Sequence, residues 1–160
     1  MPPPLSPLRS AATLAGWVLL CFSAAASGAS ISTGGWYEQL RKPDWNPPSW
    51  IFAPVWSALY TMMAVAAWLV WRRGGWRERR WPLGCFLLQW FLNALWTPLF
   101  FGLHLPGIAL VEILLLWGAL VVTVVWFWRV RPVAGVLLLP YLVWVSFAAF
   151  LNFTLWRLNS

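Results

Sequence analysis

The sequence has little charge, and most of its charge is of one sign. Only 9% of the 160 residues are charged and 61% are apolar, whereas about 25% of the residues in an ordinary soluble domain are charged. A chain of this composition cannot cover itself with a water-soluble surface, and it is too apolar to stay solvated as an open chain. A soluble globular domain and a disordered chain are therefore excluded, and one membrane domain remains.

Residues that build catalytic and metal sites are also scarce. The chain has two cysteines, one histidine and four acidic residues. Cys21 and Cys85 lie in separate apolar runs without Cys-x-x-Cys spacing, so the sequence supports neither a disulfide framework nor a zinc site. No Ser/His/Asp set, phosphate-binding glycine loop or pair of carboxylates can be assembled. Hydrolysis and phosphoryl transfer therefore have no candidate residues, and no metal site is expected.

The net charge of +7 does not indicate a nucleic-acid partner. Ten of the eleven basic residues are arginines, and they are scattered singly or held in one short connector rather than along a basic helix face. Basic residues beside apolar segments are typical of the connectors of membrane proteins.

Five apolar stretches are each long enough to cross a bilayer. A hydrocarbon core of about 30 Å needs about 20 apolar residues in a helix, and backbone groups in lipid must pair within their own segment. The predicted helices cover residues 11–31, 50–71, 83–103, 106–128 and 133–156. We therefore predict an all-α membrane protein, a five-transmembrane-helix bundle formed by one domain at 11–157 after a disordered tail at 1–10.

The first stretch has an alternative interpretation as a secretory signal, because small residues at Ala24–Ala26 follow an apolar run. The run is longer than the apolar region of a signal and contains Trp17, and only Arg9 precedes it. We therefore expect a retained helix. Cleavage would leave four helices.

The basic residues outside the spans predict an orientation. The N-terminal tail and the second and fourth connectors hold eight of them, whereas the other loops and the C-terminus hold three. The positive-inside rule then places the N-terminus in the cytoplasm of a bacterial cell, and the protein is expected to be a multi-pass protein of the cell envelope.

The sixteen tryptophans require an explanation beyond the aromatic belt that membrane proteins carry at the lipid–water interface. A belt accounts for the tryptophans near the ends of the spans. It does not account for those nearer the middle, where water is scarce and an indole N–H needs a partner. These are Trp56, Trp90, Trp96, Trp117 and Trp144.

Three predicted helices each carry one face that combines aromatic residues with polar or small ones. The faces are Phe52, Trp56 and Tyr60 in the second helix, Gln89, Asn93, Trp96 and Phe100 in the third, and Tyr141, Trp144, Ala148 and Asn152 in the fifth. Such faces are expected to point inward. Two interpretations stay open: a ligand pocket, and ordinary bundle packing with Gln89 and Asn93 as interhelical hydrogen-bonding residues.

Two further features fall near these faces. The longest connector, residues 32–49, has an unusual density of aromatic residues and prolines and is expected to fold over the helix ends. Glu112 is the one acidic residue inside a span, which makes it a functional candidate. Its place near the start of the fourth helix favours a structural role instead, because the helix dipole stabilises an anion there and interfacial water is close.

Several short motifs occur along the chain. They are Trp36-Tyr37, Lys42-Pro43, Trp45-Asn46-Pro47-Pro48, Pro54-Val55-Trp56, Asn93-Ala94-Leu95-Trp96-Thr97-Pro98 and Pro140-Tyr141-Leu142-Val143-Trp144. Together they resemble the tryptophan-rich sensory protein and translocator protein family, also called TspO/MBR or the peripheral-type benzodiazepine receptor family. The resemblance extends from the first helix to the C-terminus.

The resemblance implies a five-helix bundle, often a homodimer, with a pocket closed by the first loop. Its expected ligands are porphyrins such as protoporphyrin IX and haem, sterols and synthetic compounds, and no obligatory cofactor is expected. The resemblance implies a pocket that contains Trp56, Asn93, Trp144 and Ala148. Together with the helix faces and the lid loop, the predicted binding residues are Trp45, Asn46, Pro47, Phe52, Trp56, Tyr60, Asn93, Trp96, Tyr141, Trp144 and Ala148.

Three functions are therefore carried forward. The first is a membrane receptor, sensor or transporter that binds porphyrins. The second is a light-dependent porphyrin-degrading enzyme, because Trp56 and Trp144 match a pair linked to that reaction in some bacterial members and would serve as a radical relay. The third is a structural protein that binds sterol or lipid. Cholesterol is a poor candidate, because Phe153 replaces the central tyrosine of the animal members' weak cholesterol motif.

Overall fold

The long apolar runs of the sequence become the long helices of the fold. The computed structural model describes residues 6–29 and 35–160, with the side chains of residues 27–29 left out, and within these ranges it contains helices and no strand. The long helices are α1 (Pro7–Ala29), α3 (Phe52–Trp71), α4 (Gly75–Thr97), α5 (Pro106–Val130) and α6 (Pro132–Asn159). Each is apolar and long enough to span a membrane, which confirms the predicted five-helix architecture.

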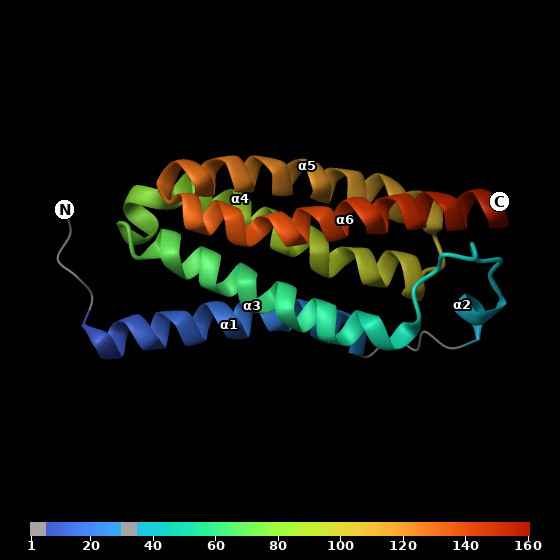
Figure 1. The fold of residues 1–160 in the computed structure, drawn as a ribbon, viewed down its shortest axis with the longest axis horizontal. Helices are drawn as coiled ribbons and strands as arrows, with labels where there is room; N and C mark the ends of the chain where they lie inside the picture. The colour runs from blue at the N-terminus through green and yellow to red at the C-terminus, as the bar shows by residue number, and fades with distance from the viewer. Residues whose placement is uncertain (1–5, 30–34) are drawn as a thin grey trace.

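Three short elements complete the chain. The one-turn helix α2 (Trp36–Gln39) lies in the first loop, a 3₁₀ turn (Ser49–Ile51) leads into α3, and a π-helical turn (Pro98–Gly102) continues α4. Figure 1 shows α2 and the rest of this loop at the end of the bundle where the chain finishes. The expected lid is therefore present over its described residues, 35–49, and contains one helical turn, whereas residues 32–34 of the predicted loop lie outside the described residues.

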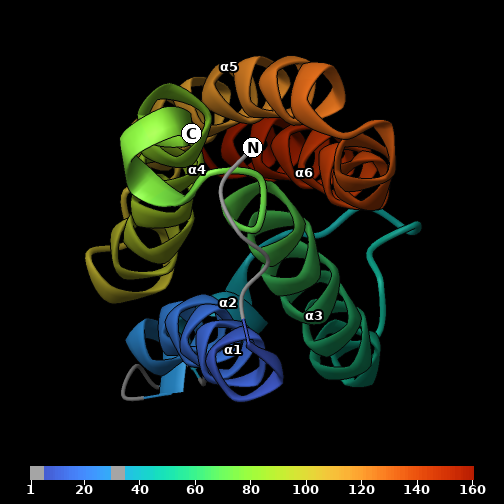
Figure 2. The ribbon, with the colours of Figure 1, turned by 90° about the vertical axis from the view of Figure 1, so that its left-hand side faces the viewer.

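The long helices form a ring. Going round it, α1 contacts α3, α3 contacts α6, α6 contacts α5, α5 contacts α4, and α4 returns to α1. The end-on view in Figure 2 shows this arrangement, with α5 and α6 on one side and α1 on the other. The first loop and the C-terminus lie at one end, and the α3–α4 and α5–α6 connections lie at the opposite end (Figure 1).

The helix α1 begins earlier than predicted, at Pro7 instead of residue 11. Ser6 acts as its N-cap, because the Ser6 hydroxyl accepts a hydrogen bond from the Arg9 N–H at 3.4 Å, and proline suits the first helical position. The residues from Pro7 to Ser10, which were expected in a disordered tail, are therefore helical. Residues 1–5 of that tail lie outside the described residues.

The helix α4 begins at Gly75, eight residues before the predicted start, so part of the arginine-rich connector is helical. The backbone leaves helical geometry once, at Arg79, three residues before Pro82, and a proline inside a helix disturbs the preceding turn. The prediction failed here because hydropathy marks where a chain enters lipid and does not mark where a helix begins in water.

The helix α1 is held in the bundle by tryptophans of its neighbours. The indole N–H of Trp90 donates to the Leu20 carbonyl at 2.8 Å, and that of Trp68 donates to the Ser10 carbonyl at 3.0 Å. Trp17 is buried and makes edge contacts with Trp71 and Phe86. The first apolar stretch is therefore part of the bundle, as the five-helix interpretation expected.

Candidate ligand pocket

A cavity of about 400 Å³ lies among α3, α4, α5 and α6 below the first loop. A volume of this size is typical of small-molecule sites. Aromatic and aliphatic side chains make up most of the lining, which consists of Tyr37, Ser49, Phe52, Ala53, Trp56, Asn93, Trp96, Thr97, Phe100, Phe101, Ile113, Leu116, Trp144, Val145, Phe147, Ala148, Leu151, Asn152 and Leu155. None of these lining residues is charged.

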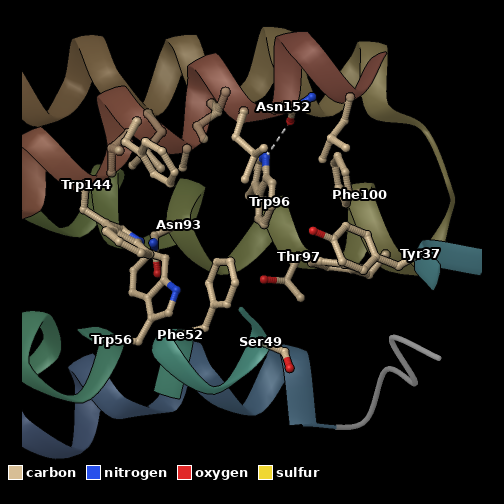
Figure 3. A pocket seen from close by; sticks show the side chains of 18 of the residues that line it. Tyr37, Ser49, Phe52, Trp56, Asn93, Trp96, Thr97, Phe100, Trp144 and Asn152 are labelled. Carbon is tan, nitrogen blue, oxygen red and sulfur yellow. Dashed lines mark hydrogen bonds between the residues drawn. The ribbon is translucent and has the colours of Figure 1, made fainter. Parts of the chain in front are cut away.

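Six of the predicted binding residues line this cavity. They are Phe52, Trp56, Asn93, Trp96, Trp144 and Ala148. They come from three helices, as the three predicted faces required, and Figure 3 shows the labelled aromatic side chains converging on one space. The other five predicted residues, Trp45, Asn46, Pro47, Tyr60 and Tyr141, lie elsewhere.

One end of the cavity is formed by Trp56, Asn93 and Trp144, which point toward one another from α3, α4 and α6 (Figure 3). The Trp56 ring stacks on Tyr60, with ring centroids 5.2 Å apart. The Trp144 ring meets the edge of Phe52 at 5.9 Å. The indole N–H groups of Trp56 and Trp144 form no hydrogen bond with any residue that the structure describes.

The other end of the cavity is closed by a hydrogen-bonded tryptophan. The indole N–H of Trp96 donates to Asn152 Oδ1 at 3.1 Å, shown dashed in Figure 3. The Asn152 amide in turn donates to the Pro106 carbonyl at 2.8 Å. The Trp96 ring also stacks on Phe100, at 5.0 Å between centroids. These contacts join α4, α6 and the start of α5, so this end of the cavity is rigid.

Tyr60 and Tyr141 were predicted to bind ligand, but both lie behind the wall of the cavity. Tyr60 is buried and its hydroxyl donates to Asn93 Oδ1 at 3.1 Å. Tyr141 is fully buried, and its ring meets the edge of Trp56 at 6.1 Å. Both residues support the position of Trp56 instead of lining the cavity. Helical spacing placed them on the correct face, but it could not show that the larger Trp56 would cover them.

The lid residues Trp45, Asn46 and Pro47 do not line the cavity either. Trp45 is 44% exposed and stacks on Phe150, with ring centroids 5.3 Å apart. Asn46 Oδ1 accepts a hydrogen bond from the Tyr37 hydroxyl at 3.1 Å. From the lid, Tyr37 and Ser49 at the end of the loop reach the cavity, and Asn46 holds Tyr37 in place. A loop has no fixed periodicity, so its sequence could not predict which side chain points inward.

Contacts with the helix ends hold the lid over the cavity. The Arg41 N–H donates to Asn159 Oδ1 at 2.9 Å, and the Asn159 amide donates back to the Arg41 carbonyl at 3.0 Å. The Trp36 ring stacks on His104, with centroids 4.3 Å apart. Burial raises the pKa of the Tyr37 phenol and the hydrogen bond to Asn46 offsets part of that rise, so the phenol stays a donor at neutral pH.

Several lining residues were not predicted. They are Tyr37, Ser49, Ala53, Thr97, Phe100, Phe101, Ile113, Leu116, Val145, Phe147, Leu151, Asn152 and Leu155. Phe100 and Asn152 were predicted to lie on inward helix faces, but they were not among the predicted binding residues. Extending the α6 spacing from Trp144 and Ala148 would have reached Leu151 and Leu155. The α5 residues carried no such signal, because that helix is almost entirely apolar and has no distinct aromatic and polar face.

Two residues deeper in the bundle behave differently from their predicted roles. Gln89 was interpreted as an interhelical hydrogen-bonding residue, but neither its amide nitrogen nor its oxygen has a partner among the described residues. Glu112 was expected near interfacial water, but it is 5% exposed and both of its carboxyl oxygens lack a partner there too. The interhelical role is therefore filled by Asn93, through its bond to Tyr60, and not by Gln89.

Comparison with known proteins decides the family. The model of the TspO/MBR family matches residues 12–157. The chain belongs to this family.

Similar proteins in the TspO/MBR family come from bacteria and animals. The chain is 42% identical to the tryptophan-rich protein TspO of Chlorobaculum tepidum over 92% of its length and 96% of that protein's. It is 40% identical to the protein CrtK of Rhodobacter capsulatus over 89% of its own length and 90% of that protein's. It is 45% identical to the human translocator protein over 78% of its own length and 75% of that protein's. The protein is therefore a multi-pass membrane protein of the TspO/MBR family, and its orientation stays a prediction.

Proposed function

We propose that this TspO/MBR protein binds porphyrins, such as protoporphyrin IX or haem, and acts as a membrane receptor, sensor or transporter for them. The observation that supports the proposal is the pair of indoles, Trp56 and Trp144, that share one cavity and whose N–H groups have no partner among the described residues. Indole N–H groups away from water usually have a partner. A ligand that offers both a flat apolar face and hydrogen-bond acceptors satisfies both properties of these residues.

The distribution of charge supports a ligand with an apolar body and an acidic edge. No charged side chain lines the cavity, so a carboxylate placed inside it would lose its hydration without compensation. At the lid, the Lys42 ammonium lies 4.6 Å from the centroid of the Tyr37 ring, which does line the cavity. A porphyrin suits this distribution of charge. Its apolar macrocycle would lie between the indoles, and its propionates would point toward Lys42 and the exposed Arg41 and Arg157.

Titration with protoporphyrin IX tests this proposal. The purified protein in detergent should show saturable quenching of tryptophan fluorescence at micromolar ligand. The double variant Trp56→Phe and Trp144→Phe should bind at least about ten-fold more weakly, which corresponds to about 1.4 kcal/mol of lost interaction. The matched control is Trp76→Phe and Trp128→Phe, which changes two exposed indoles outside the cavity and should leave the affinity unchanged.

Two outcomes would contradict the proposal. One is the absence of saturable quenching. The other is equal affinity of the two double variants, which would leave a structural role in which the cavity tryptophans serve only packing. That third function predicts lower thermal stability of the Trp56 and Trp144 variant with no change in a binding constant.

A second candidate function is light-dependent oxidation of the bound porphyrin, with dioxygen as the oxidant and the two indoles as one-electron relays. The observation that favours it is that Trp56 and Trp144 line the same cavity, so both would contact one ligand. Illumination of the complex followed by product analysis tests it. Porphyrin absorption should be lost faster with the wild-type protein than with the Trp56 and Trp144 double variant. If the rate were the same without any protein, the loss would be ordinary photobleaching in solution.

A further inference from the structure

The charged residues are divided very unevenly between the two ends of the bundle. The end that carries the start of α1 and the α3–α4 and α5–α6 connections (Figure 1) holds eight arginines and one acidic residue, Glu78. These are Arg9, Arg72, Arg73, Arg77, Arg79, Arg80, Arg129 and Arg131. The lid end holds three basic and two acidic residues. We call the first end the arginine end.

The charge of the arginine end is not neutralised within the described part of the chain. None of its eight arginines forms an ion pair with a described residue, and seven of them lie on helices or next to helix ends, where the backbone is ordered. The connector itself is held in shape, because Arg79 Nε donates to the Arg73 carbonyl at 3.1 Å. This end therefore carries eight arginines against one acidic residue, with no ion pair among the described residues, and such an excess of positive charge attracts anions.

Three arginines of this end are paired with tryptophans. Three guanidiniums lie over indole rings: Arg72 over Trp68 at 4.7 Å, Arg80 over Trp81 at 5.6 Å, and Arg129 over Trp126 at 5.9 Å. Indoles that are exposed on a membrane protein settle at the headgroup level of the bilayer. Trp81 is 66% exposed, so we expect its paired Arg80 to lie near the lipid headgroups.

We propose that the arginine end binds the headgroups of anionic phospholipids in preference to zwitterionic ones. Juxtamembrane basic clusters attract anionic lipids, and each basic residue near the surface contributes about a five-fold preference. A soluble anion would meet the same charges but would gain nothing from the exposed indoles, which contact acyl chains and glycerol. The proposal is independent of the ligand bound in the cavity.

Native mass spectrometry of the full chain tests the proposal. The protein is purified in a mild detergent with equal amounts of phosphatidylglycerol and phosphatidylcholine, and the lipids retained on the protein are counted. The test variant is R73Q/R77Q, because these exposed side chains form no hydrogen bond, ion pair or ring contact with other described groups, and their loss leaves the connector intact. The matched control is R41Q/R157Q, which removes two exposed charges at the lid end and leaves the Arg41 backbone bonds in place.

We expect several-fold more phosphatidylglycerol than phosphatidylcholine on the wild-type protein. R73Q/R77Q should bring that preference to within two-fold of equal retention, and R41Q/R157Q should change it less than two-fold. Equal retention of the two lipids by the wild type, or equal losses in both variants, would overturn the proposal. A third arm adds glycerol phosphate, and complete displacement of the lipid by this soluble headgroup at millimolar concentration would instead assign a soluble-anion site.

Discussion

The two ends of the cavity use the same residue type in opposite ways. At one end Trp96 donates to Asn152, and Asn152 donates to Pro106, so the indole cross-links three helices. At the other end Trp56 and Trp144 reach the cavity with N–H groups that have no partner among the described residues. The comparison shows that tryptophan content alone does not indicate binding. Under the proposed function, the indoles that form no hydrogen bond with a described residue are the ones available to a ligand.

The largest expected effect is at the cross-linked end. Asn152→Ala removes both hydrogen bonds and leaves the Trp96 N–H without its partner inside the bundle. We expect a loss of about 2–3 kcal/mol in stability, because interhelical hydrogen bonds reach about 1.7 kcal/mol each and a cavity adds to the loss. Thermal unfolding in detergent measures this effect, and an unchanged melting temperature would remove the distinction between the two ends.

The second prediction compares the stabilities of three tryptophan variants. Trp96→Phe loses the bond to Asn152 and should cost about 1 kcal/mol more in stability than Trp56→Phe or Trp144→Phe, which lose no hydrogen bond to a described residue. Chemical unfolding of the three variants, measured side by side, checks this order. If Trp56→Phe proved as destabilising as Trp96→Phe, the Trp56 indole would be a packing residue and not a free recognition group.

A third substitution sharpens the comparison with a polar residue outside the cavity. Gln89 is fully buried and neither of its amide atoms is bonded within the described chain, so Gln89→Leu should raise stability by about 1 kcal/mol. The control is Asn93→Leu, which loses the bond to Tyr60 and should lower stability. Destabilisation by Gln89→Leu would show that the amide has a partner in the membrane.

The smallest effect concerns the lid. Asn159→Ala removes the two hydrogen bonds that hold Arg41 to the end of α6. Because these bonds are exposed, stability should change by less than about 1 kcal/mol. Ligand dissociation, followed by stopped-flow fluorescence after protoporphyrin IX binding, should become several-fold faster. The same dissociation rate as in the wild type would mean that the stacks of Trp36 and Trp45 hold the lid without Asn159.

Much of the pocket was predictable from helical spacing. The faces that contain Trp56, Asn93 and Trp144 do converge, because residues three or four apart share one side of a helix. The same rule predicted Tyr60 and Tyr141 as lining residues, and there it failed. Spacing shows which side of a helix a residue is on, but the side chain that reaches the cavity depends on the sizes of its neighbours.

The sequence by itself determined the number of spans, the class of fold and the family, because these depend on the length and hydropathy of each segment and on short motifs. Only the tertiary structure decided which indoles are bonded and which are free. Trp96 and Asn152 are separated by 56 positions in the chain, and whether two such groups come within hydrogen-bonding distance depends on the rotation and depth of each helix in the bundle. No local pattern encodes those two quantities.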